Sequence, residues 1–213
     1  MARHHQSINE LFEAQDGLAT RTQLLALGVP ASTIRYREGP QGPWRRVLKG
    51  TIANRVGPLS RWQRLRAALL FAGPGALVTS FAALWAYDIG LGIGLGVRVL
   101  IPHARRLKPD GFVVLTRTTR LPPPVVIGSC ALAPPARAAV DACLRARSSE
   151  IVRNIVTAIV RSGRCSPAEL AHELEAHQVQ NSARLRAVLS RGQPRRRPVI
   201  VRPTPLTPWT IAR

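Results

Sequence analysis

The sequence predicts an α+β chain in three parts: three short helices with a hairpin over residues 1–57, a mixed domain over residues 58–190, and a disordered basic tail over residues 191–213. Three observations support this prediction. Helix caps and glycine stops alternate closely in the first part. Apolar residues in the second part recur at helical spacing in some segments and form short strand-like runs in others. The last twenty-three residues hold five prolines, no acidic residue and no periodicity.

The first part is defined by helix boundaries. Thr20 can cap a helix that Gly28 ends, and Val29-Pro30 then turns the chain into the next helix. A loop of glycines and prolines over residues 39–43 leads into two strands that turn at Gly50. The expected elements are a helix capped by Ser7, helices over Arg21–Leu27 and Ser32–Glu38, the latter capped by Ser32, and strands over Trp44–Lys49 and Thr51–Asn54.

The second part should combine a small sheet with several helices. Its clearest helix start is Ser166-Pro167-Ala168-Glu169, which joins an N-cap, a proline at the first helical position and a capping-box glutamate. The expected strands are Val97–Pro102, Phe112–Arg117 and Val125–Gly128. The expected helices are Leu59–Ala72, Ser80–Tyr87, Pro134–Arg147, Glu150–Arg161, Pro167 to about His177, and Ser182–Ser190.

The charge balance favours a polyanionic partner. Lys and Arg number 31 against 11 Asp and Glu, a net charge of +20, and nucleic acid is the leading polyanion. No run of eighteen apolar residues and no secretory signal is present, so we expect a cytoplasmic chain without a membrane partner. Cys130, Cys143 and Cys165 are widely spaced, which is typical of reduced, buried thiols.

The order of elements in the first part is that of a winged helix-turn-helix, in which the second helix of the motif enters the major groove and a hairpin grips the backbone. Polar and basic residues cluster on both elements. The candidate DNA contacts are Ser32, Thr33, Arg35 and Arg37 on the helix, and Arg45, Arg46 and Lys49 on the hairpin. The alternative is a structural three-helix unit with a solvated basic face.

Several segments resemble the AbiEi-type antitoxins of type IV toxin–antitoxin systems. The similar segments are Gly17–Leu24, Leu27–Arg35, Trp44–Gly50, Leu65–Ala76, Thr79–Trp85 and, more weakly, Ala133–Asp141, within residues 6–190. The resemblance implies that the chain binds operator DNA through the seven residues above. It also implies a nucleotidyltransferase-like toxin as a protein partner.

The chain departs from this family in two places. Ser80 stands where the family often has histidine, and the chain changes character where many similar proteins begin a nuclease-like domain. Two further hypotheses therefore remain: the remnant of a very-short-patch-repair-like endonuclease that has lost its catalytic domain, and a basic structural or RNA-binding module. A homodimer on an inverted repeat of DNA is compatible with the hypothesis of a DNA-binding regulator that resembles an AbiEi-type antitoxin.

No catalytic, metal or cofactor motif is visible. His172 and His177 are five residues apart, which places them about 140° apart around a helix instead of on one face. We expect a solvated helix face there, with a Glu173–His177 contact. The glycines of residues 90–96 lack the G-x-G-x-x-G spacing. The sequence thus predicts a protein that is not an enzyme.

Overall fold

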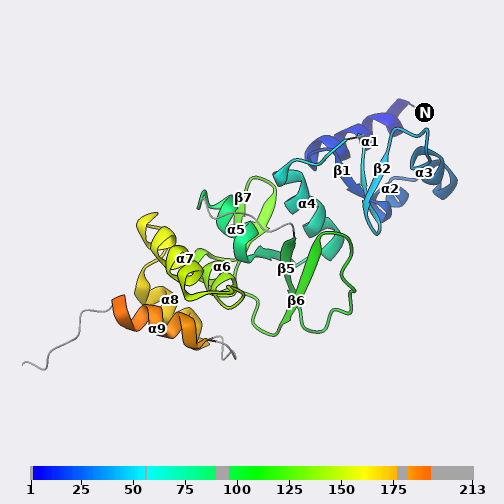
Figure 1. The fold of residues 1–213 in the computed structure, drawn as a ribbon. Coiled ribbons are helices and arrows are strands. Elements are labelled where there is room, and N and C mark those ends of the chain that lie inside the picture. Colours follow the sequence, from blue (N-terminus) through cyan, green and yellow to red (C-terminus); the bar gives the residue numbers. More distant parts are fainter. Residues whose placement is uncertain (1, 56, 90–95, 177–181, 193–213) are drawn as a thin grey trace, which may run out of the picture.

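The computed structural model describes residues 2–55, 57–89, 96–176 and 182–192 (Figure 1). Within these ranges the chain is α+β, with nine helices and two sheets, which confirms the predicted class. The tail was predicted to begin at residue 191, which was wrong for Arg191 and Gly192, because these two residues end the last helix. The rest of the predicted tail, residues 193–213, lies outside the described residues.

The N-terminal unit packs three helices on a three-stranded antiparallel sheet of order β1-β3-β2. Its elements are α1 (Ala2–Ala14), β1 (Leu18–Thr20), α2 (Arg21–Ala26), α3 (Ala31–Arg37), β2 (Arg45–Leu48) and β3 (Thr51–Ala53). Phe12, Leu24, Ile34 and Trp44 meet in one buried cluster. The helix order and the hairpin follow the prediction.

Three local predictions for this unit were wrong. Helix α1 begins at Ala2, so Ser7 lies inside it and does not cap it. Helix α3 begins directly after Pro30, with no side-chain cap, so Ser32 lies in its first turn. Pro30 occupies the N-cap position with φ −59°, and its ring has no oxygen that could accept from the amides of the first turn. Strand β1 was not predicted, because a strand of three residues shows no alternation.

The second sheet has five strands in the order β6-β5-β4-β8-β7. Strand β4 runs antiparallel to β5 and parallel to β8, and β5 runs parallel to β6. Its elements, with the helices, are α4 (Arg61–Ala72), β4 (Leu77–Thr79), α5 (Ser80–Ala86), β5 (Val97–Pro102), β6 (Val113–Thr118), β7 (Val125–Ile127), β8 (Cys130–Leu132), α6 (Pro135–Cys143), α7 (Ser149–Arg161), α8 (Pro167–Ala176) and α9 (Ala183–Gly192). Strands β4 and β8 were not predicted; β5 has the expected bounds.

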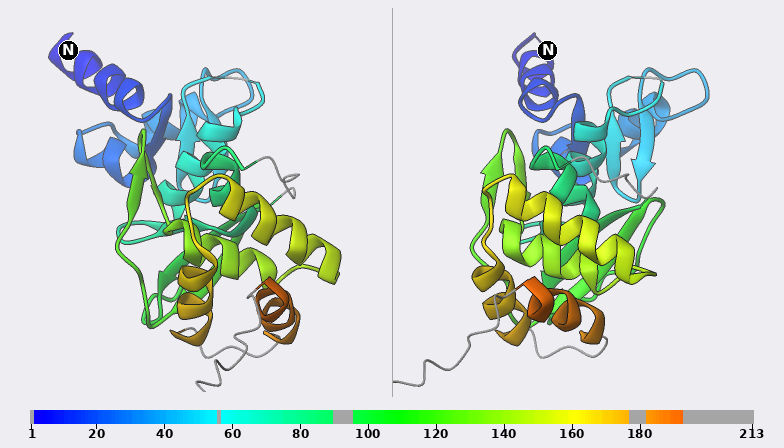
Figure 2. Two further views of the ribbon diagram at one scale, coloured as in Figure 1. Left: turned by 90° about the vertical axis from the view of Figure 1, so that its left-hand side faces the viewer. Right: turned by 60° about the vertical axis from the view of Figure 1, so that its left-hand side comes forward.

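Helix α4 joins the two parts of the molecule. It contacts strands of both sheets. Leu18, Leu48 and Ala53 of the N-terminal sheet belong to the large central core and not to the N-terminal cluster. Helices α6–α9 gather at the far end from α1–α3 (Figure 1, Figure 2). The N-terminal sheet therefore has one face on its own helices and a second face on α4.

Candidate nucleic-acid interface

The turn between α2 and α3 is fixed by hydrogen bonds at both ends of α2. At the start, the Thr20 hydroxyl accepts from the Gln23 amide at 3.1 Å, and the Gln23 side chain accepts from the Thr20 amide at 2.8 Å. At the end, Gly28 adopts φ +79°, and the Val29 amide donates to the Leu24 carbonyl at 3.0 Å. This Schellman arrangement requires the left-handed conformation that glycine adopts without strain. The two helices are therefore held at a defined angle.

Helix α3 divides into a buried and an exposed face. Ile34 is fully buried in the N-terminal core, and Thr33 is half-buried. Ser32, Arg35 and Tyr36 are exposed, and the Tyr36 side chain is 82% accessible. Residues three and four positions apart are neighbours on a helix, so these three share one face. Tyr36 was missed by sequence reasoning, although its spacing from Ser32 was a usable signal.

Arg37 is less free than predicted. Its guanidinium lies over the Trp44 ring, 4.9 Å from the centroid, and Trp44 in turn packs on Phe12. An ion pair closes the same end of the helix pair, from Arg21 Nη1 to Glu38 Oε2 at 3.3 Å. These contacts hold α3 against the core and commit the Arg37 side chain to an aromatic face.

The hairpin residues have different environments. Arg46 is exposed on β2, whereas Arg45 is half-buried and its Nε is buried with no acceptor among the described residues. Lys49 is exposed at the tip, but its amide donates to Asp110 Oδ2 at 2.5 Å, while the Gly50 carbonyl accepts from the Arg21 amide at 2.8 Å. The tip is thus tied to the central domain.

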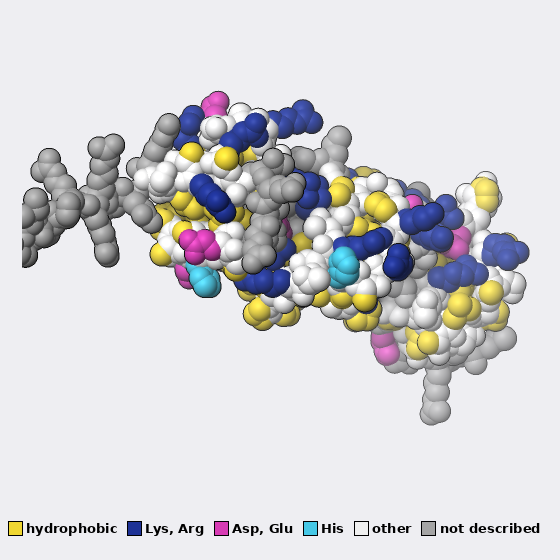
Figure 3. Space-filling view, turned by 90° about the horizontal axis from the view of Figure 1, so that it is seen from below, with side chains coloured by type: hydrophobic (Ala, Val, Ile, Leu, Met, Phe, Trp, Pro, Cys, Tyr) yellow, Lys and Arg dark blue, Asp and Glu magenta, His cyan; other side chains and the backbone are white. Residues whose placement is uncertain are grey.

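The seven predicted residues differ in exposure: Ser32, Arg35, Arg46 and Lys49 are exposed, whereas Thr33, Arg37 and Arg45 are half-buried. Strand β2 starts beside the end of α3, where the Trp44 amide donates to the Arg37 carbonyl. Its four residues carry the chain roughly 13 Å before the tip. Arg46 is accordingly nearer to α3 along the strand than Lys49 is. Lys and Arg side chains gather at this end of the molecule and continue along the underside of the central domain (Figure 3).

A second polar cluster lies inside the central domain. Arg137 is 1% exposed, and its Nε donates to both oxygens of Asp141 at 3.2 and 3.1 Å. Asp141 also accepts from the Thr79 hydroxyl at 2.6 Å. Glu173 accepts from both terminal nitrogens of Arg120, at 2.6 and 2.8 Å. This arrangement satisfies buried charges by pairing them, and it connects α6, α8 and the sheet inside the domain.

The predicted solvated helix face around Glu173 was therefore wrong. Glu173 is buried and paired with arginines, not part of a solvated helix face; His177 lies outside the described residues. Burial and the nearby Arg145 also lower the pKa of Arg98, which Asp141 partly offsets. The predicted capping box of α8 is confirmed, since Ser166 and Glu169 exchange hydrogen bonds that lower the pKa of Glu169.

The described residues contain no group of three or more side chains arranged to hold a metal ion. None of their helices has the length and apolar character needed to cross a membrane. Cys130, Cys143 and Cys165 are all buried and unpaired, as predicted. No protein-family model matches the chain, and no curated protein matches its sequence.

Proposed function

We propose that the chain binds duplex DNA sequence-specifically through α3, and that its N-terminal unit is a winged helix-turn-helix of a transcriptional regulator. The observation that carries the proposal is the exposed face of Ser32, Arg35 and Tyr36, opposite the buried Ile34, on a helix held by a fixed turn. The order α1-β1-α2-α3-β2-β3, with β3 between the other strands, supports it.

The exposed groups have separate roles in this proposal. Arg35 is suited to a bidentate contact with guanine, and Ser32 can hydrogen-bond to a base edge or a phosphate. The Tyr36 hydroxyl can donate a hydrogen bond to a phosphate of the DNA backbone. Arg46 and Lys49 contact the phosphates of the DNA beside the groove. Arg37, which lies on the Trp44 ring, and Arg45, which is half-buried, contribute positive charge behind this surface.

The overall charge supplies the part of the affinity that does not depend on sequence. The net charge is +20, and each phosphate neutralised releases counterions, so affinity should fall steeply with salt. Six of the cations lie in residues 191–213, where no acid occurs. Deleting residues 191–213 should therefore weaken binding to every sequence alike. The salt slope should decrease by about 0.9 for each phosphate that the tail no longer neutralises.

The experiment selects a preferred duplex from a random pool and titrates the variants against it and against random DNA. Arg35→Ala should cost about 1–3 kcal/mol on the preferred duplex and much less on random DNA. Arg153→Ala is the matched control, because Arg153 is also exposed but lies on α7 at the other end of the molecule (Figure 1). If Arg35→Ala and Tyr36→Ala leave the preferred site unaffected while the tail deletion abolishes binding, the chain is a non-specific polyanion binder.

The antitoxin role is a further step of the same proposal, and it rests on the resemblance to AbiEi-type proteins. It assigns the central domain to the neutralisation of a nucleotidyltransferase-like toxin and allows a homodimer on an inverted repeat. Co-expression with the product of the neighbouring gene tests it. Rescue of growth by the full chain, and co-purification of the two proteins, are the expected results; growth arrest despite equal expression contradicts the role.

A further inference from the structure

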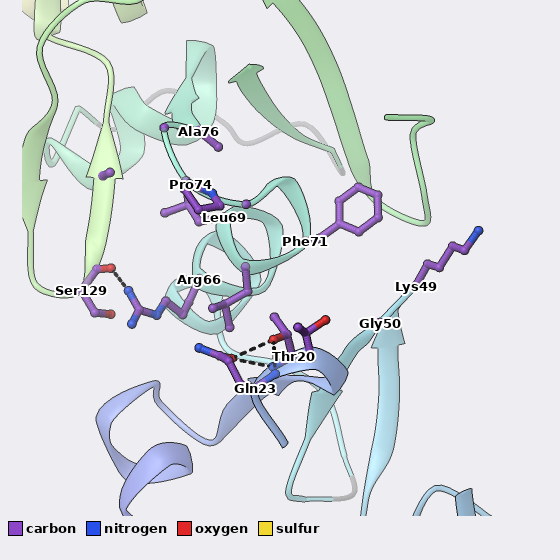
Figure 4. A pocket seen from close by; sticks show the side chains of 15 residues that line it. Thr20, Gln23, Lys49, Gly50, Arg66, Leu69, Phe71, Pro74, Ala76 and Ser129 are labelled. Atoms are coloured by element: carbon purple, nitrogen blue, oxygen red, sulfur yellow. Dashed lines mark hydrogen bonds between the residues drawn. The ribbon is translucent and has the colours of Figure 1, made fainter. Parts of the chain in front are cut away.

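A cavity of about 700 Å³ lies between the N-terminal unit and the central sheet. Its walls come from the start of α2, the tip of the β2–β3 hairpin, the C-terminal half of α4 with the segment that follows it, and the turn between β7 and β8 (Figure 4). The volume is within the usual range of small-molecule sites. It belongs neither to the exposed face of α3 nor to the buried ion cluster.

The charged groups that line this cavity are all positive. Lys49 and Arg66 contribute a cation each, and none of the described residues that line it is Asp or Glu. Arg66 Nη1 donates to the Ser129 carbonyl, which orients the guanidinium, while Nε is buried and has no acceptor among the described residues. Because protein atoms enclose Nε, an oxyanion in the cavity would interact with the charge of the guanidinium and not with this nitrogen.

The space between the two cations is largely apolar. Leu69 and Phe71 line the cavity from α4, and in Figure 4 Arg66 and Lys49 lie toward opposite ends of it. The opposite wall is rigid, because Thr20 and Gln23 are engaged in the α2 capping box. The hydroxyl of the exposed Thr22 adds a polar group at the rim. Because this wall is already ordered, the protein loses little conformational freedom when a ligand binds against the apolar floor.

We propose that this cavity binds a small organic anion that joins a carboxylate, sulfonate or phosphate group to an apolar body. The oxyanion is held by Arg66, with Lys49 adding attraction from the other end, and the apolar body rests on Leu69 and Phe71. The site stands on its own geometry and does not depend on DNA binding.

The test uses 8-anilinonaphthalene-1-sulfonate, an aromatic sulfonate whose fluorescence rises in an apolar site, with the full-length chain and calorimetry to count the sites. We expect one saturable site. Phenyl phosphate should displace the dye better than inorganic phosphate or benzyl alcohol, because only phenyl phosphate carries both features. Arg66→Gln should weaken binding about tenfold or more, since it removes a charged hydrogen-bond donor.

Arg61→Gln is the matched control, because Arg61 is an exposed arginine on the same helix outside the cavity. It should bind the dye like the unmodified chain. Circular dichroism checks that each variant folds, and Lys49→Gln provides the second variant if Arg66→Gln does not fold. Equal weakening in the Arg66 and Arg61 variants, or displacement by benzyl alcohol as readily as by phenyl phosphate, overturns the proposal. Displacement by a short DNA duplex at one-to-one stoichiometry also overturns it, because it assigns the cavity to DNA.

Discussion

Replacing Asp141 with Asn removes one charge from the buried pair with Arg137 while keeping the size of the side chain. Arg137 is 1% exposed, so its charge is left without its closest counterion in a region that water does not reach. Breaking such a pair costs about 3–5 kcal/mol. Glu173 Oε1 remains 3.7 Å from Arg137 Nη1, which favours the lower end, about 3 kcal/mol. That is a large fraction of the stability of a typical domain, about 5–15 kcal/mol.

Urea unfolding followed by circular dichroism measures this destabilisation. With a slope of about 2–3 kcal/mol per molar, the midpoint should fall by roughly 1 M or more. Asp88→Asn is the control, because the Asp88 side chain is 92% exposed and its nearest contact to Arg164 is 3.8 Å; it should cost about 0–1 kcal/mol. The double variant Arg137→Met with Asp141→Asn should be destabilised by less than the sum of the single changes. Equal midpoints for the Asp141 and Asp88 variants would refute the reasoning.

Four other predictions concern the junction of the two parts and the thiols. The fragment 1–57 should be at most marginally folded, because it exposes Leu18 and Leu48, whose burial contributes roughly 3–6 kcal/mol; a cooperative thermal transition of the isolated fragment would contradict this. Asp110→Ala should leave the selected sequence unchanged, because it releases the hairpin tip at Lys49 and does not alter α3; a shifted preference would count against it. Burial raises the pKa of Cys143 to about 12 and of Cys165 to about 11, from 9.0, so the native thiols should react with dithionitrobenzoate only after unfolding. Unfolded thiols ionise first, so the free energy of unfolding should fall as pH rises from about 9 toward 11–12; a flat profile there is the contrary result.

Local signals in the sequence were enough for the elements whose boundaries depend on their own residues. The Ser166–Glu169 capping box begins α8, and the apolar spacing of residues 150–161 matches α7. Strands β1, β4 and β8 have three residues each and are stabilised by partners distant in sequence. No periodicity can be read from such short segments, because a strand pattern needs about four residues or more.

In the candidate site, too, features set by local sequence could be predicted, and features set by distant residues could not. The exposed face of α3 could be inferred from the position of Ile34, since residues on a helix alternate between faces with a known period. The tether of Lys49 could not, because Asp110 is 61 positions away. Arg137 and Asp141 resemble a surface i,i+4 pair in the sequence, and only the packing of α6 against the sheet and α8 makes them interior. Non-local packing decides these cases.

The tethered hairpin tip also bears on where sequence specificity can reside. Its position is set by Asp110 on one side and by the start of α2 on the other, so the tip cannot adjust freely to a groove. Arg45 is partly buried and Arg37 lies on Trp44, which leaves little freedom for either to reach a base. Among the described residues of the N-terminal unit, the exposed face of α3 alone combines a freely accessible Arg35 with a rigid support. Base readout in the proposed complex should therefore come from α3, with the hairpin fixing only how the duplex lies against the chain.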